Sequence, residues 1–331
     1  MSTGVTLVGA GALGQGLAAH LVRSGPTTLL ARAATAERLR ADGVLAVRGG
    51  AVTEAVRVET GPGSVRVVDD PADVPADDVV LFATKGPELP AVAAAVASHW
   101  PRGTGAVAGL QNGVAKDRVL AEVFGADAVV GAATVLGAKR ADGEVLVTGL
   151  GATYLGEFGG PPSDRIGRLA DRFTSAGLPC VVCDDIAGLL WTKCANALAA
   201  FGVSSLSRLA STSMMRREPL VRAFLDLLAE AAAVAAADGS PVGDYPDLPI
   251  ASYLSRPADE VADELLARIR ATAPPAEPAY SSMALDVLLG RPTEVGPVFG
   301  EVVERAARLG VAVPRLDLTA RIVAGLTAAE A

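Results

Sequence analysis

The feature that most constrains this chain is a group of glycines close to its N-terminus. Residues 5–10 form a continuous apolar run, which is typical of a strand buried on both faces of a parallel sheet. Gly9 lies near the end of this run, and Gly11 and Gly14 come after it. A helical pattern of apolar residues extends over 13–23. A strand that turns through glycines directly into a helix predicts the first unit of an α/β domain with a parallel sheet.

The glycines have the spacing G-x-G-x-x-G, which gives each of them a separate physical task. The first permits a tight turn, the second lets a phosphate approach the backbone, and the third lets helix and strand pack closely. The helix N-terminus then offers unpaired N–H groups and the positive end of its dipole to an anion. A glycine-rich turn without a ligand is the alternative. We expect a dinucleotide to bind here, with contacts from Gly9, Ala10, Gly11, Ala12, Leu13 and Gly14.

The residue after the second expected strand indicates which dinucleotide binds. This strand covers 27–31 and is followed by Arg32, with no acidic residue before Glu37. An NAD site places an Asp or Glu here for the ribose hydroxyls, whereas a guanidinium suits a 2′-phosphate. Arg32, with Arg38 as a second cation, therefore predicts NADP(H). A solvated loop charge is the alternative for Arg32.

The strand and helix patterns divide the chain near residue 185. Before that point, short apolar runs alternate with helical patterns; after it, nearly every pattern is helical. The prediction is a Rossmann-type α/β domain with a mostly parallel sheet at 1–185, followed by an all-α domain at 186–331. Further strands are expected at 44–47 and 51–58, as a candidate hairpin across the Gly49-Gly50 turn, and at 65–68, 79–83, 106–110 and 179–182, with β structure over 129–157. Helices are expected at 89–99, 163–175, 186–201, 216–237, 258–271, 282–289, 296–309 and 315–328.

Charge and cysteine content exclude several classes of protein. The net charge of -8 over 331 residues argues against a nucleic-acid partner or an anionic membrane surface. No apolar stretch has the roughly 20 uncharged residues of a membrane span, and the first residues do not resemble a signal peptide. Cys180 and Cys183 form a lone C-x-x-C that we interpret as part of a strand. His20 and His99 have no partner cluster, so no metal site is expected, and a cytoplasmic location is predicted.

Four further segments carry a resemblance to the ketopantoate reductase (2-dehydropantoate 2-reductase) family. The last is the most specific, because S-S-M-x-x-D followed by G-R-x-T-E is an unusual combination. Their order and spacing are similar to those of the family along nearly the whole chain. The segments are Ala83-Thr84-Lys85, Leu110-Gln111-Asn112-Gly113, Trp191-Thr192-Lys193, and Ser281 to Asp286 with Gly290 to Glu294. The resemblance implies a hydride transfer from NADP(H) to a 2-oxo acid.

The resemblance also implies roles for two ionisable residues. Lys193 matches the family's proton donor, a task that suits a lysine whose pKa is lowered by burial or nearby positive charge. A solvated helix charge is the alternative, although Lys193 lies in a largely apolar run at 189–195. Glu294 matches a glutamate that orients the lysine and touches the cofactor ribose. Its alternative is a surface acid at the start of a helix.

Three polar residues match family positions around the cofactor and substrate. Asn112 matches an amide near the nicotinamide and substrate, Lys85 a lysine near the cofactor and the site entrance, and Ser282 a hydroxyl that binds substrate. The structural alternatives are a plain turn at Asn112 and a helix N-cap at Ser282. Both roles are compatible if Ser281 caps the helix instead.

The resemblance is incomplete on the helix that follows Lys193. Many family members carry asparagines four and eight residues after the lysine, where this chain has Ala197 and Phe201. Asn196 is one residue away from the first of these positions, which rotates it about 100° around a helix. Asn196 is still expected to contact the substrate, together with Asn112 and Ser282. The pocket should be more apolar than one lined by two amides.

The predicted function is the NADPH-dependent reduction of 2-dehydropantoate to pantoate, a step in pantothenate and coenzyme A biosynthesis. One alternative is a reductase of the same fold that acts on a more apolar 2-oxo acid or ketone. Another is an NADP(H) sensor without turnover, although a sensor has no need of the proton donor Lys193. The helical half of the chain is the candidate surface for a homodimer.

Overall fold

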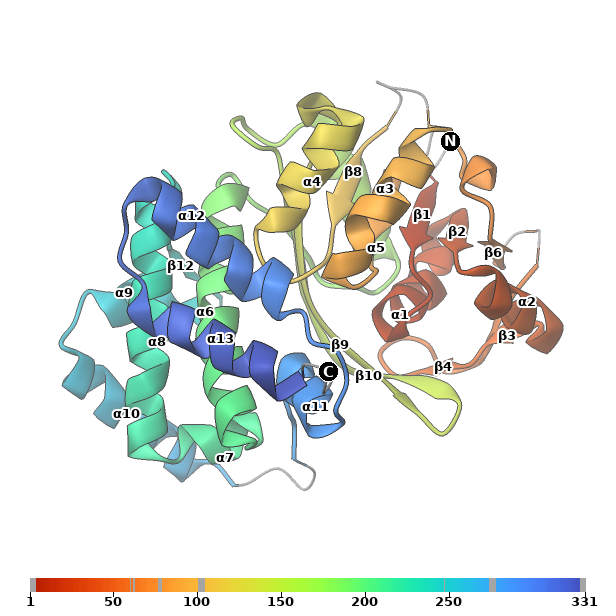
Figure 1. Ribbon diagram of the computed structural model, residues 1–331. Coiled ribbons are helices and arrows are strands. Elements are labelled where there is room, and N and C mark those ends of the chain that lie inside the picture. The colour runs from red at the N-terminus through yellow and green to blue at the C-terminus, as the bar shows by residue number, and fades with distance from the viewer. Residues whose placement is uncertain are drawn as a thin grey trace. The chain divides into compact units, whose positions relative to one another are not determined.

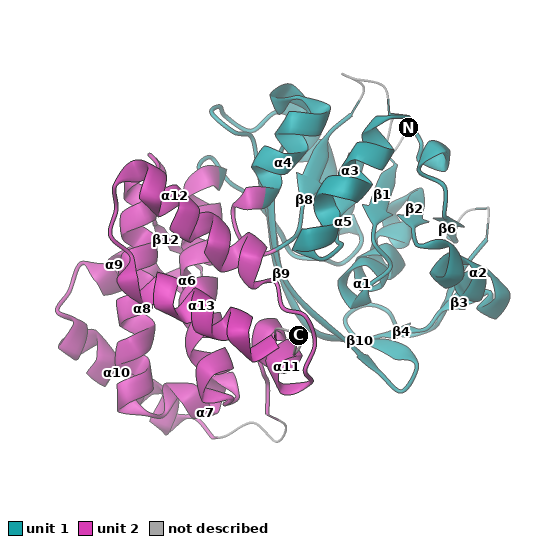
Figure 2. Cartoon of the chain, in the orientation of Figure 1, with its two compact units in different colours: residues 1–111, 116–186 teal, residues 112–115, 187–331 magenta. Residues whose placement is uncertain are grey.

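The structure is a computed structural model that describes residues 4–59, 61, 63–76, 79–100, 105–246, 248–273 and 278–327. The chain divides into two compact units (Figure 2). Unit 1 comprises Met1–Gln111 and Lys116–Ile186, and unit 2 comprises Asn112–Ala115 and Ala187–Ala331. The division is therefore close to a single cut near residue 185, with the exception of the short segment 112–115.

A parallel sheet lies at the centre of unit 1, with the strand order β6-β2-β1-β7-β8. Its described strands all pair in parallel. Every residue of β1, β2 and β7 is buried, which explains why these strands appear as continuous apolar runs in the sequence. The strands are β1 (Val5–Val8), β2 (Thr27–Leu30), β6 (Val65–Val68), β7 (Val79–Phe82) and β8 (Val107–Gly109).

Helices connect successive strands and cover both faces of the sheet. Side chains alternate along each strand, so Leu7 and Leu81 share one core with α1 and α5, whereas Val80 and Phe82 share another with α3 and α4. Figure 1 shows α3 and α4 side by side on their face. The helices of unit 1 are α1 (Ala12–Leu21), α2 (Ala33–Asp42), α3 (Leu89–Ala97), α4 (Ala115–Phe124) and α5 (Asp164–Ser175), with short 3-10 turns at η1 (Val22–Ser24), η2 (Pro71–Asp73), η3 (Gly86–Glu88) and η4 (Ala126–Ala128).

A long antiparallel hairpin completes unit 1. It consists of β9 (Gly131–Ala141) and β10 (Glu144–Gly156), and it turns through Asp142 and Gly143, which both have positive φ angles. β10 also pairs with β4 (Val47–Arg48) and β11 (Cys180–Val182). The expected hairpin across Gly49-Gly50 exists in part, since β3 (Val44–Leu45) pairs antiparallel with β5 (Val56–Arg57).

The regular structure described in unit 2 is helical, apart from the two-residue strands β12 (Asp244–Tyr245) and β13 (Leu248–Pro249). α8 packs against α10, α12 and α13, and α6 contributes a series of buried side chains to the same core. The helices are α6 (Ile186–Ser207), α7 (Ser211–Met215), α8 (Glu218–Ala237), α9 (Ile250–Leu254), α10 (Ala258–Ala271), α11 (Ser282–Leu288), α12 (Glu301–Leu309) and α13 (Pro314–Thr327), with a π-helical turn, η5 (Gly296–Gly300), before α12. The fold class expected from the sequence is confirmed.

α6 is the one helix of the described residues that is long and apolar enough to cross a membrane by length and composition alone. Of its most apolar window, 72% is buried inside the protein. Such burial is typical of the core helix of a globular unit.

Candidate functional site

The glycine loop after β1 has the conformation that its spacing predicts. Gly9 has a φ angle of +112°, and its N–H donates to Leu30 O at 2.9 Å, which fixes the loop to the end of β2. A Cβ on Gly14 would lie 1.9 Å from Gly9 O, so only glycine allows this approach of α1 to the strand. A Cβ on Gly11 would meet no described heavy atom within 4 Å. The backbone at Gly11 therefore faces open space at the N-terminus of α1, as a pyrophosphate site requires.

Two side chains hold the carbonyl of the residue between these glycines. Ala10 O accepts a hydrogen bond from Gln15 Nε2 at 2.8 Å and another from Arg140, also at 2.8 Å. Gln15 is buried on the first turn of α1, and Arg140 lies on β9. Our sequence analysis identified neither residue. Gln15 is a polar residue within an apolar helix pattern, but no local signal connects Arg140 with a loop 130 residues away.

The segment that follows β2 carries cations, and the nearby Asp69 at the end of β6 is paired with Arg40. Arg32 is the N-cap residue of α2, its side chain is exposed, and the first turn of this helix has no acidic residue. Within the described part of the chain, no carboxylate forms an ion pair with Arg32. Arg38, six residues further along α2, pairs with Asp42 at 3.3 Å. These residue types and this position fit the 2′-phosphate of NADP(H).

The carboxyl ends of β7 and β8 carry the next predicted residues. In α/β sheets, ligands bind next to the carboxyl ends of the strands. Lys85 is exposed and caps η3, and Thr84 beside it accepts a hydrogen bond from Gln111 Nε2 at 3.3 Å. Thr84 also lies against the glycine loop, since a Cβ on Gly9 would come within 2.9 Å of it. Gln111, which is only 7% exposed, is a polar residue of this edge that our sequence analysis did not single out.

α6 carries Lys193 and Asn196 in unit 2. Both side chains are half-buried, while Trp191, Thr192 and Cys194 are buried. Because residues three apart in a helix lie on the same face, Lys193 and Asn196 share the less covered side of α6. Asn196 is one residue before the position where many family members have an asparagine. It nevertheless lies on the same face of α6 as Lys193.

The turn of α6 that holds Lys193 is anchored on both sides. Trp191 Nε1 donates to Asp238 Oδ2 at 3.1 Å, and the guanidinium of Arg305 bonds the same oxygen at 2.7 Å while lying 5.6 Å from the indole centroid. Thr192 Oγ1 donates to Gly188 O at 2.7 Å and accepts from Gly243 N at 2.8 Å. These contacts fix the rotation of α6 about its own axis, and with it the direction of Lys193.

The segment that contains Asn112 packs within the helical unit. Gly113 has a φ angle of +88°, and a Cβ built on it would lie 3.1 Å from Pro297 O on η5. Val114 belongs to the core of unit 2. Glu294 lies two residues before the start of η5, and its carbonyl accepts from Val298 N at 3.1 Å. The structure therefore places Asn112 and Glu294 on neighbouring segments.

The two consecutive serines at the start of α11 have different tasks. Ser281 is the N-cap and accepts from Ala284 N at 3.2 Å. Its hydroxyl also pairs with Ser204 Oγ of α6 at 2.7 Å, which attaches α11 to the lysine-bearing helix. A helix N-cap was the structural alternative for Ser282, but the N-cap of α11 is Ser281. Ser282 is exposed, so its hydroxyl remains accessible to a ligand.

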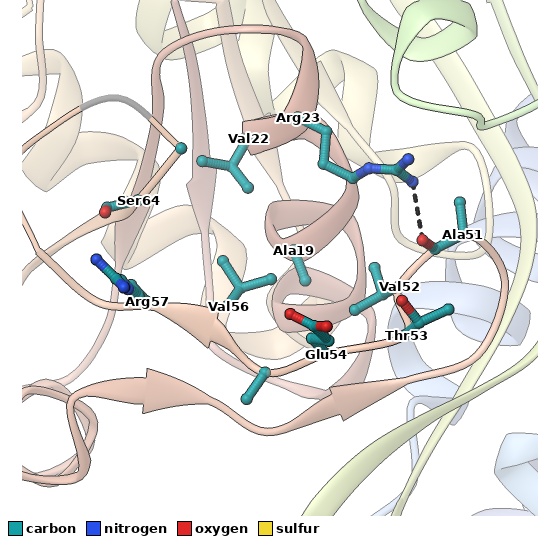
Figure 3. Close-up of a pocket in the computed structure, with 12 residues that line it drawn as sticks. Ala19, Val22, Arg23, Ala51, Val52, Thr53, Glu54, Val56, Arg57 and Ser64 are labelled. Atoms are coloured by element: carbon teal, nitrogen blue, oxygen red, sulfur yellow. Dashed lines mark hydrogen bonds between the residues drawn. The ribbon is translucent and has the colours of Figure 1, made fainter.

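Two other features of unit 1 do not form part of this site. Burial raises the pKa of Cys180 to about 12 and that of Cys183 to about 11, so both remain protonated and unreactive. A hollow of about 420 Å³ lies at the C-terminal end of α1, opposite the glycine loop, where Arg23 donates to Ala51 O (Figure 3). None of the predicted site residues lines this hollow.

The chain is similar to known proteins over most of its length. The sequence profile of "Ketopantoate reductase PanE/ApbA" matches residues 5–160, and its C-terminal counterpart matches 185–327. A 2-dehydropantoate 2-reductase from Mycobacterium tuberculosis H37Rv is 31% identical, with 98% of each chain covered. The crystal structure of a PanE/ApbA family ketopantoate reductase from Ralstonia eutropha JMP134 is 26% identical, with a TM-score of 0.78 and 98% of both chains covered. A D-mandelate dehydrogenase solved with NADH and anilino(oxo)acetate is 19% identical with a TM-score of 0.78 over 98% of both chains, and it shares the fold.

The parallel sheet and the glycine loop at the carboxyl end of β1 are those of a dinucleotide-binding domain, and the matched family consists of pyridine-nucleotide-dependent reductases. The two profile matches together cover most of the sequence, and the mycobacterial relative aligns over nearly all of it. The chain belongs to the ketopantoate reductase family.

Proposed function

We propose that this protein reduces 2-dehydropantoate to pantoate with NADPH. The observation that carries the proposal is the position of Lys193, half-buried on an anchored turn of α6 with Asn196 on the same face. A lysine in such surroundings is suited to donate a proton to a carbonyl oxygen as the carbonyl carbon receives a hydride. The family membership makes 2-dehydropantoate the first substrate to test.

In this proposal, residues 1–185 act as the nucleotide-binding domain. The loop Gly9-Ala10-Gly11-Ala12-Leu13-Gly14 holds the pyrophosphate through backbone N–H groups. Arg32 pairs with the 2′-phosphate, and Lys85 contacts the cofactor from the end of β7. The bound dinucleotide supplies the hydride.

Residues 186–331, with the segment that carries Asn112, supply the catalytic and substrate-binding groups. Lys193 donates the proton, and Glu294 orients its ammonium group and contacts the cofactor ribose. The amide of Asn112 can accept from the lysine and donate to the carbonyl oxygen. Ser282 and Asn196 provide the remaining polar contacts to the substrate.

A second candidate is the reduction of a more apolar 2-oxo acid or ketone. It is favoured by Ala197, which is only 7% exposed and offers no hydrogen bond, and by the half-buried Phe201. These residues occupy the positions where many family members have asparagines. A site that does not pair with a substrate hydroxyl discriminates weakly against analogues without one. A sensor without turnover is disfavoured because it has no need of a proton donor.

The test is a panel of 2-oxo acids assayed with NADPH and with NADH. We expect NADPH to be preferred by about ten-fold or more in kcat/KM, the scale of one charge-assisted contact. Loss of the substrate hydroxyl, as in 2-oxoisovalerate, should cost only about ten- to hundred-fold. Turnover of a bulkier oxo acid but not of 2-dehydropantoate would favour the second candidate. Equal use of both cofactors would contradict the NADP(H) assignment, and NADPH binding without any turnover would indicate a sensor.

We further propose a cytoplasmic homodimer formed through unit 2. The three cysteines are free thiols, which suits a reducing compartment. The outer face of α13 leaves Leu318, Ile322 and Leu326 exposed at a spacing of four residues. A second copy of the chain would cover this apolar stripe.

A further inference from the structure

Arg140 contacts the glycine loop from a distant part of the sequence. It lies on β9 close to the turn of the β9–β10 hairpin. Its guanidinium donates to Ala10 O at 2.8 Å, across 130 residues of sequence. β9 also packs against α1, the helix that begins at the loop. The hairpin therefore brings a cation to the loop at which the dinucleotide is expected.

The contact fixes the orientation of one peptide group. Ala10 O accepts from both Gln15 and Arg140. Because a peptide unit is planar and trans, the N–H of Gly11 must point away from these two donors. Gly11 also faces open space. The charge of Arg140 thus lies on the other side of the loop from the N–H that a pyrophosphate would use.

Arg140 also lies within electrostatic range of one cation of α2, Arg38. Burial lowers the pKa of its guanidinium, and the positive charge of Arg38 lowers it further. In the part of the chain that the structure describes, no carboxylate pairs with Arg140 or Arg32. Guanidinium groups that repel one another are stabilised when an anion binds among them. The glycine loop is hydrogen-bonded to the end of β2 through Gly9 N and Leu30 O. The part of the dinucleotide nearest these arginines would therefore be the 2′-phosphate on the adenosine ribose.

We infer that Arg140 is a specificity-determining residue that, with Arg32 and Arg38, selects the 2′-phosphate of NADP(H). This inference rests on the proposed use of NADP(H). Arg140 supplies charge from the hairpin side and holds the Ala10 carbonyl, whereas Arg32 and Arg38 supply charge from α2. An enzyme of this fold without a cation at position 140 would rely on the α2 side alone.

Binding of two small ligands separates the contribution of the 2′-phosphate from that of the rest of the cofactor. Adenosine 2′,5′-bisphosphate carries this phosphate and AMP does not, and calorimetry gives the Kd of each without turnover. Arg140→Gln should raise the Kd of the bisphosphate about ten-fold and that of AMP less than about two-fold, because one charge-assisted contact to the 2′-phosphate is lost. Arg140→Lys, which keeps the charge, should retain most of the preference. The difference between wild type and Arg140→Gln should shrink as salt rises.

Arg48 offers a matched control because it lies on β4 against the same hairpin and pairs with Glu144. Arg48→Gln should leave both Kd values unchanged, and the unfolding midpoint of each free variant reports its fold. An unchanged ratio of the two Kd values in Arg140→Gln overturns the inference. Equal weakening of both ligands also overturns it, because Arg140 would then only position the loop. A wild type that binds both ligands equally contradicts the proposed NADP(H) use itself, and that outcome is visible before any variant is made.

Discussion

At the scale of single residues, the proposed chemistry depends on one ammonium group held on an otherwise buried helix turn. Lys193→Ala should lower kcat by about 10²–10⁴, the usual contribution of a positioned acid, while the Kd of NADPH changes little. Glu294→Gln should show a smaller loss, because it removes an orienting group and not the proton donor. Stopped-flow kinetics with a saturating 2-oxo acid measures kcat, and fluorescence titration measures Kd. A Lys193→Ala variant with near-normal kcat would mean that another group donates the proton.

His20 is a second residue whose surroundings give a measurable effect. It is fully buried on α1, its Nδ1 pairs with Gly16 O at 2.8 Å, and Nε2 has no hydrogen-bond partner among the residues that the structure describes. Burial lowers its pKa below 6.5, its value in the unfolded chain, and the charge of Arg23 adds to this effect. A folded-state pKa below the unfolded value means that acid favours unfolding.

The contribution of His20 to stability is therefore fully present above about pH 6.5 and is lost as the pH falls through its folded-state pKa. Denaturant unfolding at about pH 7.5 and pH 5.5 should show wild type losing more free energy of unfolding than His20→Gln between the two conditions. His99→Gln is the control, since His99 is exposed and is the other histidine of the chain. Equal acid sensitivity of wild type and His20→Gln would exclude this explanation.

Residues whose role depends on local sequence could be identified before the structure. The three glycines have the conformation or close packing that their spacing requires, because a turn between strand and helix is a local event. The roles of Lys193, Glu294, Asn112, Asn196 and Ser282 stay predictions that came from the resemblance. The contacts of Gln111 and Arg140 could not be found in this way, since their partners Thr84 and Ala10 lie in loops distant in the sequence and no spacing encodes them.

At the scale of secondary-structure elements, a buried carboxylate of another helix accepts hydrogen bonds from the first N–H groups of α13. Glu230 of α8 is 8% exposed, and its oxygens accept from Arg315 N at 3.0 Å and Leu316 N at 2.9 Å. These are N–H groups in the first turn of α13, which have no partner within the helix. A negative charge here also suits the helix dipole.

Glu230→Ala should therefore lower the free energy of unfolding by about 2 kcal/mol or more, since buried N–H groups lose a charged acceptor. Glu230→Gln should cost less, because one acceptor oxygen remains. Asp226→Asn is a matched control on the same helix, where an exposed carboxylate pairs with Arg315 at 3.4 Å, and it should change stability by less than about 1 kcal/mol. Urea unfolding measures all three. A Glu230→Ala variant as stable as Asp226→Asn would contradict the capping role.

The elements that sequence reasoning missed or misplaced depend on tertiary contacts. α6 was expected to end at residue 201 but continues to Ser207, where its last turns are stabilised by packing and by the bond from Ser204 to Ser281. The helix expected at 296–309 begins as the π-helical η5. β4 pairs with β10 instead of completing the expected local hairpin. Continuous apolar runs such as β1 and β7 were found because burial on both faces is visible in the sequence itself.

At the scale of the whole molecule, net charge and local charge have opposite signs. The chain has an excess of acids, yet the glycine loop and the start of α2 present Arg32, Arg38 and Arg140. A negative surface keeps the protein away from polyanions, and a local cluster of cations can still bind one small anion. A net charge that argues against nucleic-acid partners is therefore compatible with a local phosphate site.

The helical unit leaves an apolar surface that a second copy of the chain would cover. Leu318, Ile322 and Leu326 of α13 are 51%, 42% and 38% exposed. Beside them, α6, α8 and α13 border an apolar groove of about 390 Å³. Apolar side chains that recur every four residues on one helix face are typical of a surface that packs against another helix. We therefore expect light scattering to give a mass near twice 33.4 kDa at micromolar concentration.

Leu318→Glu combined with Ile322→Glu should convert the dimer to a monomer, because two charges in the centre of an apolar interface lose their hydration without gaining a partner. Val182→Glu is the matched control, since Val182 is 40% exposed on β11 of unit 1 and should leave the mass unchanged. Far-UV circular dichroism of both variants shows whether the helical unit remains folded. A wild-type protein that is monomeric at tens of micromolar, or a folded double variant that remains dimeric, would place the dimer contact elsewhere or exclude it.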